Sequence, residues 1–160
     1  MKLIINKTPT DAGVIEVSGV DFSHTDTTVF RALTLSISPG AVTAVTGPNG
    51  CGKSTLLELL AGVHPVAAGT IARGTRNVAL AVQRSAVTDS FPVTVTEAVM
   101  MGQQDAPLLL LDEPTTGLDA DSARLVLAHL RRFADAGTTV VAATHDCALI
   151  AAAEHRVELG

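Results

Sequence analysis

The hydrophobic and polar positions alternate over short distances in the first third of the chain, and a helical period begins only at Lys53. Residues 13–22, 33–38 and 41–47 are runs rich in Val, Ile, Leu and Thr, and Gly, Ser and Pro separate them. Such runs predict strands. A helix is predicted next, ending near Gly62, because the leucines after Lys53 recur at helical spacing: Leu56, Leu57, Leu59 and Leu60.

Strand-like and helix-like segments then alternate to the end of the chain. The pattern predicts strands over residues 69–74, 77–83, 108–112, 138–144 and 155–159. It predicts helices over residues 94–102, 119–136 and 147–153, the last of them capped by Asp146. The run "LLLL" before Asp112 has no polar alternation, which is typical of a parallel strand buried on both faces. We therefore predict an α/β fold with a mostly parallel sheet flanked by helices.

Size and composition narrow the possible functions. The chain has 160 residues, so residues 1–160 are expected to form a single domain. The net charge is -5 and Lys and Arg do not cluster, which argues against a nucleic-acid partner. The start lacks the apolar core of a signal peptide and no run is long enough to span a membrane, so a cytoplasmic protein is expected. Cys51 and Cys147 have no metal-ligand spacing and are expected to be free thiols.

The segment "TGPNGCGKST" carries the chemistry of a phosphate-binding loop. Gly47, four residues, Gly52, Lys53 and Ser54 follow the G-x-x-x-x-G-K-[ST] pattern, between a predicted strand and a predicted helix. The glycines let backbone N–H groups surround a phosphate, and the helix N-terminus adds positive charge. Lys53 is expected to reach the β- and γ-phosphates, and the Ser54 hydroxyl to hold Mg²⁺. The expected nucleotide-binding residues of the loop are Gly47, Pro48, Asn49, Gly50, Cys51, Gly52, Lys53, Ser54 and Thr55. The alternative is a Gly-rich turn that only starts a helix.

A pair of acids follows the buried strand. Asp112 and Glu113 are expected at the carboxyl edge of the sheet, where ligands bind in open α/β folds. Asp112 is predicted to hold Mg²⁺ through a water molecule, and Glu113 to orient or deprotonate an attacking water. The alternative is a solvated strand end or a helix N-terminal charge.

Five motifs, taken in their order along the chain, resemble those of the ATP-binding subunits of ABC transporters. The resemblance covers nearly the whole chain. "GPNGCGKST" resembles the Walker A motif, Gln83 the Q-loop glutamine and "LLLLDEPT" the Walker B motif. Asp119 in "TGLD" resembles the D-loop, and His145 in "VVAATHD" the switch histidine. The stretch "FPVTVTEAVMMG" most resembles the zinc and manganese importer branch. The resemblance implies a P-loop NTPase core with an antiparallel β portion at its N-terminal end, and ATP and Mg²⁺ as cofactors.

The resemblance also implies roles for single residues. Gln83 would contact Mg²⁺ or the attacking water, and His145 the γ-phosphate; an exposed strand-end Gln and a structural His are the alternatives. His24 stands where the family has an adenine-stacking Tyr, with a plain surface His as the alternative. The resemblance further implies that two subunits pair head to tail as a homodimer. Such a homodimer would dock on a membrane permease and lie at the inner face of the cell membrane.

The chain departs from the family between the Q-loop and the Walker B motif. Only 28 residues separate Gln83 from Asp112, and the L-S-G-G-Q signature of the family's helical subdomain occurs nowhere in the 160 residues. We therefore predict an internal deletion near residues 102–103, with Mg-ATP binding retained but hydrolysis, the homodimer and transport coupling impaired. The runner-up is a non-hydrolysing nucleotide-binding module or a defective truncated product. A split ATPase of the chromosome-maintenance type is disfavoured, because no coiled-coil heptads flank the gap.

Overall fold

A computed structural model describes residues 2–6, 13–75, 77–82 and 107–160 of the chain. Most strands belong to a six-stranded sheet of order β1-β6-β7-β8-β4-β9, in which β1 is antiparallel to β6 and the other five strands are parallel. These strands are β1 (Lys2–Asn6), β6 (Val78–Val82), β7 (Leu108–Asp112), β8 (Thr139–Ala143), β4 (Val42–Thr46) and β9 (His155–Glu158).

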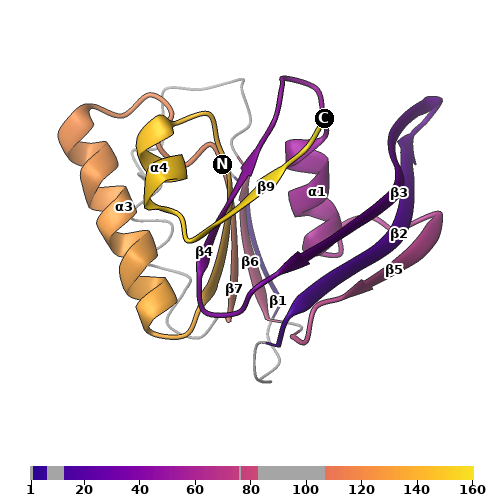
Figure 1. Ribbon diagram of the computed structural model, residues 1–160, viewed down its shortest axis with the longest axis horizontal. Coiled ribbons are helices and arrows are strands. Elements are labelled where there is room, and N and C mark those ends of the chain that lie inside the picture. Colours follow the sequence, from indigo (N-terminus) through magenta and orange to yellow (C-terminus); the bar gives the residue numbers. More distant parts are fainter. Residues whose placement is uncertain (1, 7–12, 76, 83–106) are drawn as a thin grey trace.

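A second sheet is antiparallel and has the order β3-β2-β5. Its strands are β2 (Ile15–His24), β3 (Thr27–Ile37) and β5 (Ala68–Ala72). It lies beside α1 (Lys53–Leu60), which separates it from the six-stranded sheet (Figure 1). The predicted antiparallel β portion at the N-terminal end of the domain is confirmed.

Helices cover both faces of the six-stranded sheet. The helix α1 lies on one face, and α3 (Ala120–Asp135) and α4 (Cys147–Ala152) lie on the other (Figure 1). Alternate residues of β7 enter different cores: Leu108 and Leu110 pack on the α1 side, Leu109 and Leu111 on the α3 side. All four are buried, which explains why this strand reads as a continuous apolar run.

The predicted elements are confirmed wherever the structure describes them. The helix α3 buries Val126, Leu130 and Ala134, which recur every four residues. Asp146 caps α4 by accepting a hydrogen bond from the Ala148 N–H at 2.8 Å. The pattern did not predict β1, because its short apolar run is interrupted at Asn6 and has no alternation of its own. These residues nevertheless form a strand, because their backbone groups pair with β6 at the edge of the parallel strands.

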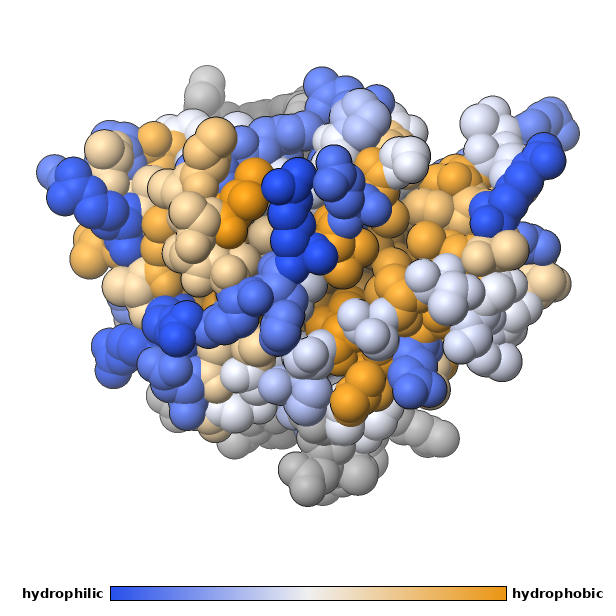
Figure 2. Space-filling model, in the orientation of Figure 1, coloured by the Kyte–Doolittle hydropathy of each residue, from blue (hydrophilic) through white to orange (hydrophobic). Residues whose placement is uncertain are grey.

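Three sequence predictions lie outside the described residues: Gln83, the helix over 94–102 and the junction near 102–103. Apolar residues gather where the two sheets meet, and hydrophilic residues lie around them in the same view (Figure 2). Within the described part of the chain, no helix is long and apolar enough to cross a membrane.

Candidate functional site

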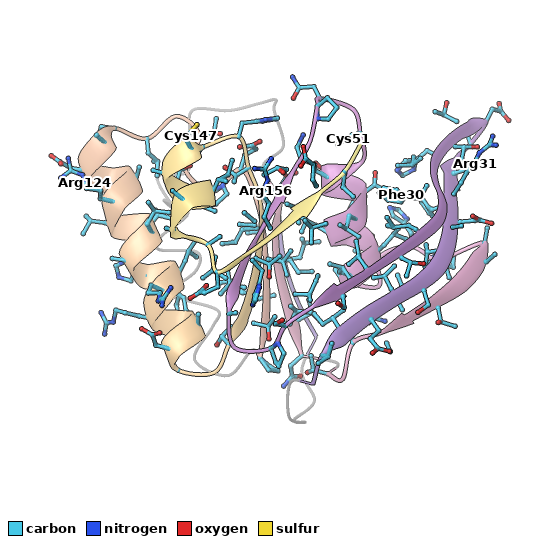
Figure 3. The ribbon with its side chains drawn as sticks, in the orientation of Figure 1. Phe30, Arg31, Cys51, Arg124, Cys147 and Arg156 are labelled. Carbon is cyan, nitrogen blue, oxygen red and sulfur yellow. The ribbon has the colours of Figure 1, made fainter. Side chains whose placement is uncertain are left out.

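The predicted phosphate-binding loop connects the end of β4 to the start of α1. Gly52 has φ +101°, and a Cβ atom placed there would lie 2.7 Å from both Phe30 Cζ and Val29 Cγ1. A side chain at this position is therefore excluded both by the backbone conformation and by the packing of β3. In Figure 3, Cys51 lies in the loop at the top of α1 and Phe30 on the neighbouring strand. The antiparallel sheet thus supports the loop from one side.

Lys53 is buried and turns back into the loop that precedes it. Its ammonium group donates hydrogen bonds to the carbonyl oxygens of Gly47 at 2.8 Å and Pro48 at 3.0 Å. Cys51 N–H also donates to the Pro48 oxygen at 3.3 Å. These contacts hold a positive charge inside the loop, beside the N-terminus of α1, which is itself partly positive. The arrangement is suited to an anion.

The loop and the pair of acids meet at one edge of the sheet. The Ser54 hydroxyl donates to Asp112 Oδ2 at 2.6 Å, although the residues are 58 positions apart. Burial raises the pKa of the Asp112 carboxyl, the Ser54 hydrogen bond opposes that rise, and the nearby Glu113 carboxylate adds to it. Lys53 lowers the pKa and Glu58 raises it by smaller amounts. The carboxylate at Asp112 therefore lacks full compensation for its desolvation.

Glu113 has an unusual backbone conformation for a residue with a side chain. Its φ is +49°, and its N–H donates to the Ala143 carbonyl at 2.8 Å, which ties it to the end of β8. Glu113 Oε2 accepts from the Thr116 hydroxyl at 3.3 Å and from the His145 N–H at 3.4 Å. The His145 ring nitrogen Nε2 lies 3.5 Å from Glu113 Oε1. Left-handed residues of this kind cost about 1–3 kcal/mol and cluster at functional sites.

His24 lies beside the first turn of α1. Its Nε2 is 3.4 Å from Thr55 Oγ1, in the first turn of α1. The ring forms edge-to-face contacts with Phe22 and with His64. The neighbourhood of His64 was not predicted from the sequence, because nothing in the periodicity of residues 61–67 indicates where that loop turns.

Two aspartates have structural contacts that the motif pattern does not reveal. Asp119 is the N-cap of α3 and accepts from the Ser122 N–H at 2.8 Å, and this hydrogen bond lowers the Asp119 pKa. The Asp146 pKa is lowered chiefly by a hydrogen bond from the Thr115 hydroxyl. Asp146 therefore connects the segment after the paired acids with the start of α4. An N-cap position was predictable at Asp146, but its contact with Thr115 depends on the tertiary structure.

The donors at the sheet edge fit Mg²⁺ bound together with a nucleotide. The hydroxyl of Ser54 and the carboxylate of Asp112 are hard oxygen ligands within 2.6 Å of each other. Among the described residues no group of three or more His, Cys, Asp or Glu side chains is arranged to hold a metal ion. Mg²⁺ commonly takes one or two protein ligands and completes its shell with phosphate oxygens and water.

Known proteins match this chain in sequence and in structure. A family model described as "ABC transporter" matches residues 30–98. The hemin import ATP-binding protein of Streptomyces coelicolor is 33% identical over 192 residues, covering 82% of this chain and 69% of that protein. The chain belongs to the ABC transporter ATP-binding family. The manganese transport ATP-binding protein of Listeria monocytogenes is 25% identical over 198 residues, covering 86% of this chain and 82% of that protein.

Other relatives of this ABC family member match over shorter stretches or by fold alone. An iron(III) import ATP-binding protein of Rhodococcus jostii is 49% identical over 65 residues, and the match spans only 19% of that protein. A solved structure titled as the ATP-binding subunit of an ABC transporter superposes with a TM-score of 0.73 at 18% identity, covering 91% of this chain and 85% of that one. The similarity in structure shows the fold.

The alignments with full relatives are longer than the chain itself. They run over 192 residues for the hemin relative and 198 for the manganese relative, against 160 residues here. Both relatives therefore contain stretches that no residue of this ABC domain matches.

Proposed function

We propose that this chain is the Mg-ATP-binding part of an ABC importer for a metal ion such as zinc or manganese, with reduced capacity to hydrolyse ATP. The observation that supports it best is the 2.6 Å hydrogen bond from Ser54 to Asp112. That contact brings the phosphate-binding loop and the half-buried Asp112 together at the carboxyl edge of a parallel sheet, which is where nucleotides bind in such folds.

The triphosphate binds over the loop formed by residues 47–52. Backbone N–H groups of the loop and of the first turn of α1 donate to phosphate oxygens, and Lys53 exchanges its two carbonyl acceptors for the β- and γ-phosphates. The Thr55 hydroxyl lies at the same helix end, with His24 next to it on the side where the base binds. The cofactors in this proposal are ATP and Mg²⁺.

Ser54 would hold Mg²⁺ through its hydroxyl and Asp112 through a water molecule, with Gln83 as the further ligand expected from the family pattern. When bound, the ion neutralises charge on the β- and γ-phosphate oxygens. The desolvated Asp112 carboxylate would then gain a positive charge in addition to that of Lys53.

Hydrolysis, where it occurs, depends on Glu113 and His145. The Glu113 carboxylate accepts a proton from a water molecule while the water oxygen bonds to the γ-phosphorus and the bond to ADP breaks. His145 donates to a γ-phosphate oxygen and, through its N–H, keeps the Glu113 carboxylate oriented. Glu113 directly follows β7 and His145 lies just after the adjacent β8, and the hydrogen bond from the Glu113 N–H to the Ala143 carbonyl joins the two strand ends.

The internal deletion near residues 102–103 accounts for the reduced activity. The sequence lacks the L-S-G-G-Q signature, which in this family stabilises the γ-phosphate of a partner subunit's nucleotide. An arginine finger stabilises the γ-phosphate of a partner's nucleotide in a comparable way, and its loss lowers the rate of hydrolysis about 10³- to 10⁵-fold. The excess length of the hemin and manganese alignments supports a missing segment.

The cargo and partner follow from relatives and from the segment "FPVTVTEAVMMG". Relatives named for import of hemin, manganese and iron(III) support a metal-ion importer. The physiological partner class is a membrane permease, which places the protein on the cytoplasmic side of the membrane. Without the helical subdomain, both the permease contact and the head-to-tail homodimer are weakened.

The test is calorimetric titration with Mg-ATP and with a non-hydrolysable analogue, together with phosphate release. Tight binding with slow turnover supports the proposal, and no binding of either nucleotide refutes it. Glu113→Gln separates the alternatives, because it removes the base but keeps the shape of the side chain. Abolished residual turnover supports a weak ATPase, whereas unchanged background with intact binding supports a non-hydrolysing module. Asp121→Asn on the exposed side of α3 is the matched control.

A further inference from the structure

Three rings contact one another beside the phosphate-binding helix. The ring centroids of Phe22 and His24 are 4.8 Å apart, those of His24 and His64 are 5.5 Å apart, and those of Phe22 and His64 are 5.6 Å apart. The chain has no Trp or Tyr and only four Phe residues, so aromatic surface is scarce in it. Among the described residues, the ring cluster beside α1 therefore offers an aromatic surface on which a base could stack.

The position of the His24 ring depends mainly on its two ring neighbours. Its polar contact is long, 3.4 Å to Thr55 Oγ1. The planes of Phe22 and His64 both lie at 89° to that of His24, and they are tilted by only 33° from each other. Phe22 and His64 therefore each meet the His24 ring edge to face. Neither neighbour stacks parallel on it.

His64 is held beside His24 by a contact with Glu58. The His64 Nε2 lies 3.2 Å from Glu58 Oε2, and because a carboxylate only accepts, the imidazole nitrogen is the donor. Glu58 belongs to α1, one turn after Ser54, and its charge also acts on Asp112. The ring that supports His24 is therefore anchored to the same helix that begins with the phosphate-binding residues.

We propose that His64, fixed by Glu58, is a positioning residue that orients His24 against the nucleotide base. The proposal rests on the proposed function, namely that this chain binds Mg-ATP. An imidazole has a smaller π surface than the side chain of Tyr, so its orientation matters more for the contact with a base. Glu58, His64 and His24 couple that contact to the helix that binds the triphosphate.

The test compares a ligand that has a base with one that does not. Calorimetric titrations use Mg-ATP and inorganic Mg-tripolyphosphate with the wild type, His64→Ala, His64→Phe and His24→Ala proteins. His64→Ala is expected to weaken ATP binding about 2- to 10-fold, the range for loss of one aromatic pair. His24→Ala is expected to weaken it about 5- to 100-fold, as for loss of a base-stacking side chain. Affinity for tripolyphosphate stays unchanged in both proteins.

Two further variants distinguish a positioning role of His64 from a general loss of structure: His64→Phe, and the double variant of His24→Ala with His64→Ala. His64→Phe keeps a ring against His24 and is expected to recover most of the ATP affinity. In the His24→Ala background, His64→Ala causes no further loss, because His64 acts through His24. His129→Ala is the matched control: it removes an imidazole from α3, on the opposite face of the sheet, where His129 donates to the Leu125 carbonyl.

Several results of these titrations would contradict the proposed role of His64. Unchanged ATP affinity in His64→Ala, or an equal loss for ATP and tripolyphosphate, contradicts a role in orienting the base contact. Additive losses in the double variant make His64 an independent contact rather than a positioning residue. A wild-type protein that binds tripolyphosphate as tightly as ATP refutes this proposal alone. A wild type that binds neither ligand refutes the proposed function as well.

Discussion

The strained backbone of Glu113 predicts an inversion of the usual order of alanine and glycine stability. The residue has φ +49°, a conformation that costs an L-residue about 1–2 kcal/mol. Glycine avoids this cost but loses about 0.5–1 kcal/mol through the greater freedom of its unfolded chain. The free energy of unfolding of Glu113→Gly should therefore be about 0.5–1 kcal/mol higher than that of Glu113→Ala.

Comparing these two variants cancels the side-chain contributions. Both remove the carboxylate that accepts from the Thr116 hydroxyl and the His145 N–H, so only the backbone term differs. For a chain of this size, about 1 kcal/mol corresponds to about 2–4 °C in Tm. Urea and thermal unfolding followed by far-ultraviolet circular dichroism measure the difference. That method is suitable because the chain has no Trp or Tyr to report by fluorescence.

The control uses an exposed position inside a regular helix. Ala128 lies in the middle of α3, and Ala128→Gly is expected to destabilise the protein by about 1 kcal/mol. Glycine is thus expected to be the less stable choice at 128 and the more stable choice at 113. If Glu113→Ala proves as stable as Glu113→Gly, or more so, the argument from backbone strain is refuted.

Three further predictions concern the charged groups of the site. Lys53→Ala should weaken Mg-ATP binding about 10- to 150-fold in calorimetry, because charge-assisted hydrogen bonds to phosphate contribute about 1.5–3 kcal/mol. Asp112→Asn should raise Tm relative to the wild type without nucleotide; since burial raises the folded pKa, the gain is absent below about pH 4 and grows as pH rises. Asp119→Ala should lower Tm at neutral pH, because Asp119 caps α3; its folded pKa is lowered, so the difference disappears as pH falls below about 4.

Each of these predictions has a clear contrary result. Equal ATP affinity in Lys53→Ala would show that the ammonium group stays on the loop carbonyls when nucleotide binds. A Tm difference for Asp112→Asn that does not change between acid and neutral pH would exclude desolvation of the carboxylate as its cause. For Asp119→Ala, an unchanged Tm at neutral pH would mean that α3 does not depend on its cap.

The sequence alone determined the class of fold and most elements of the site. Period-two and helical patterns predicted nearly every strand and helix that the structure describes, because each element buries a face set by its own local period. The phosphate-binding loop was equally predictable, since its glycines, Lys53 and Ser54 act through backbone positions that are close in sequence. The pairing of Asp112 with this loop followed from the rule that parallel strands present their carboxyl ends at one edge.

Only the tertiary structure decided the features that depend on contacts between distant segments. The left-handed backbone of Glu113 is tied to Ala143 on the neighbouring strand, and no local pattern encodes that hydrogen bond. The contact of His24 with His64 joins residues 40 positions apart in sequence, through a loop whose path has no period to read. Likewise β1 forms a strand because the β6 edge offers unpaired backbone groups. Local periodicity fixes which face an element buries, whereas packing fixes which residues then meet.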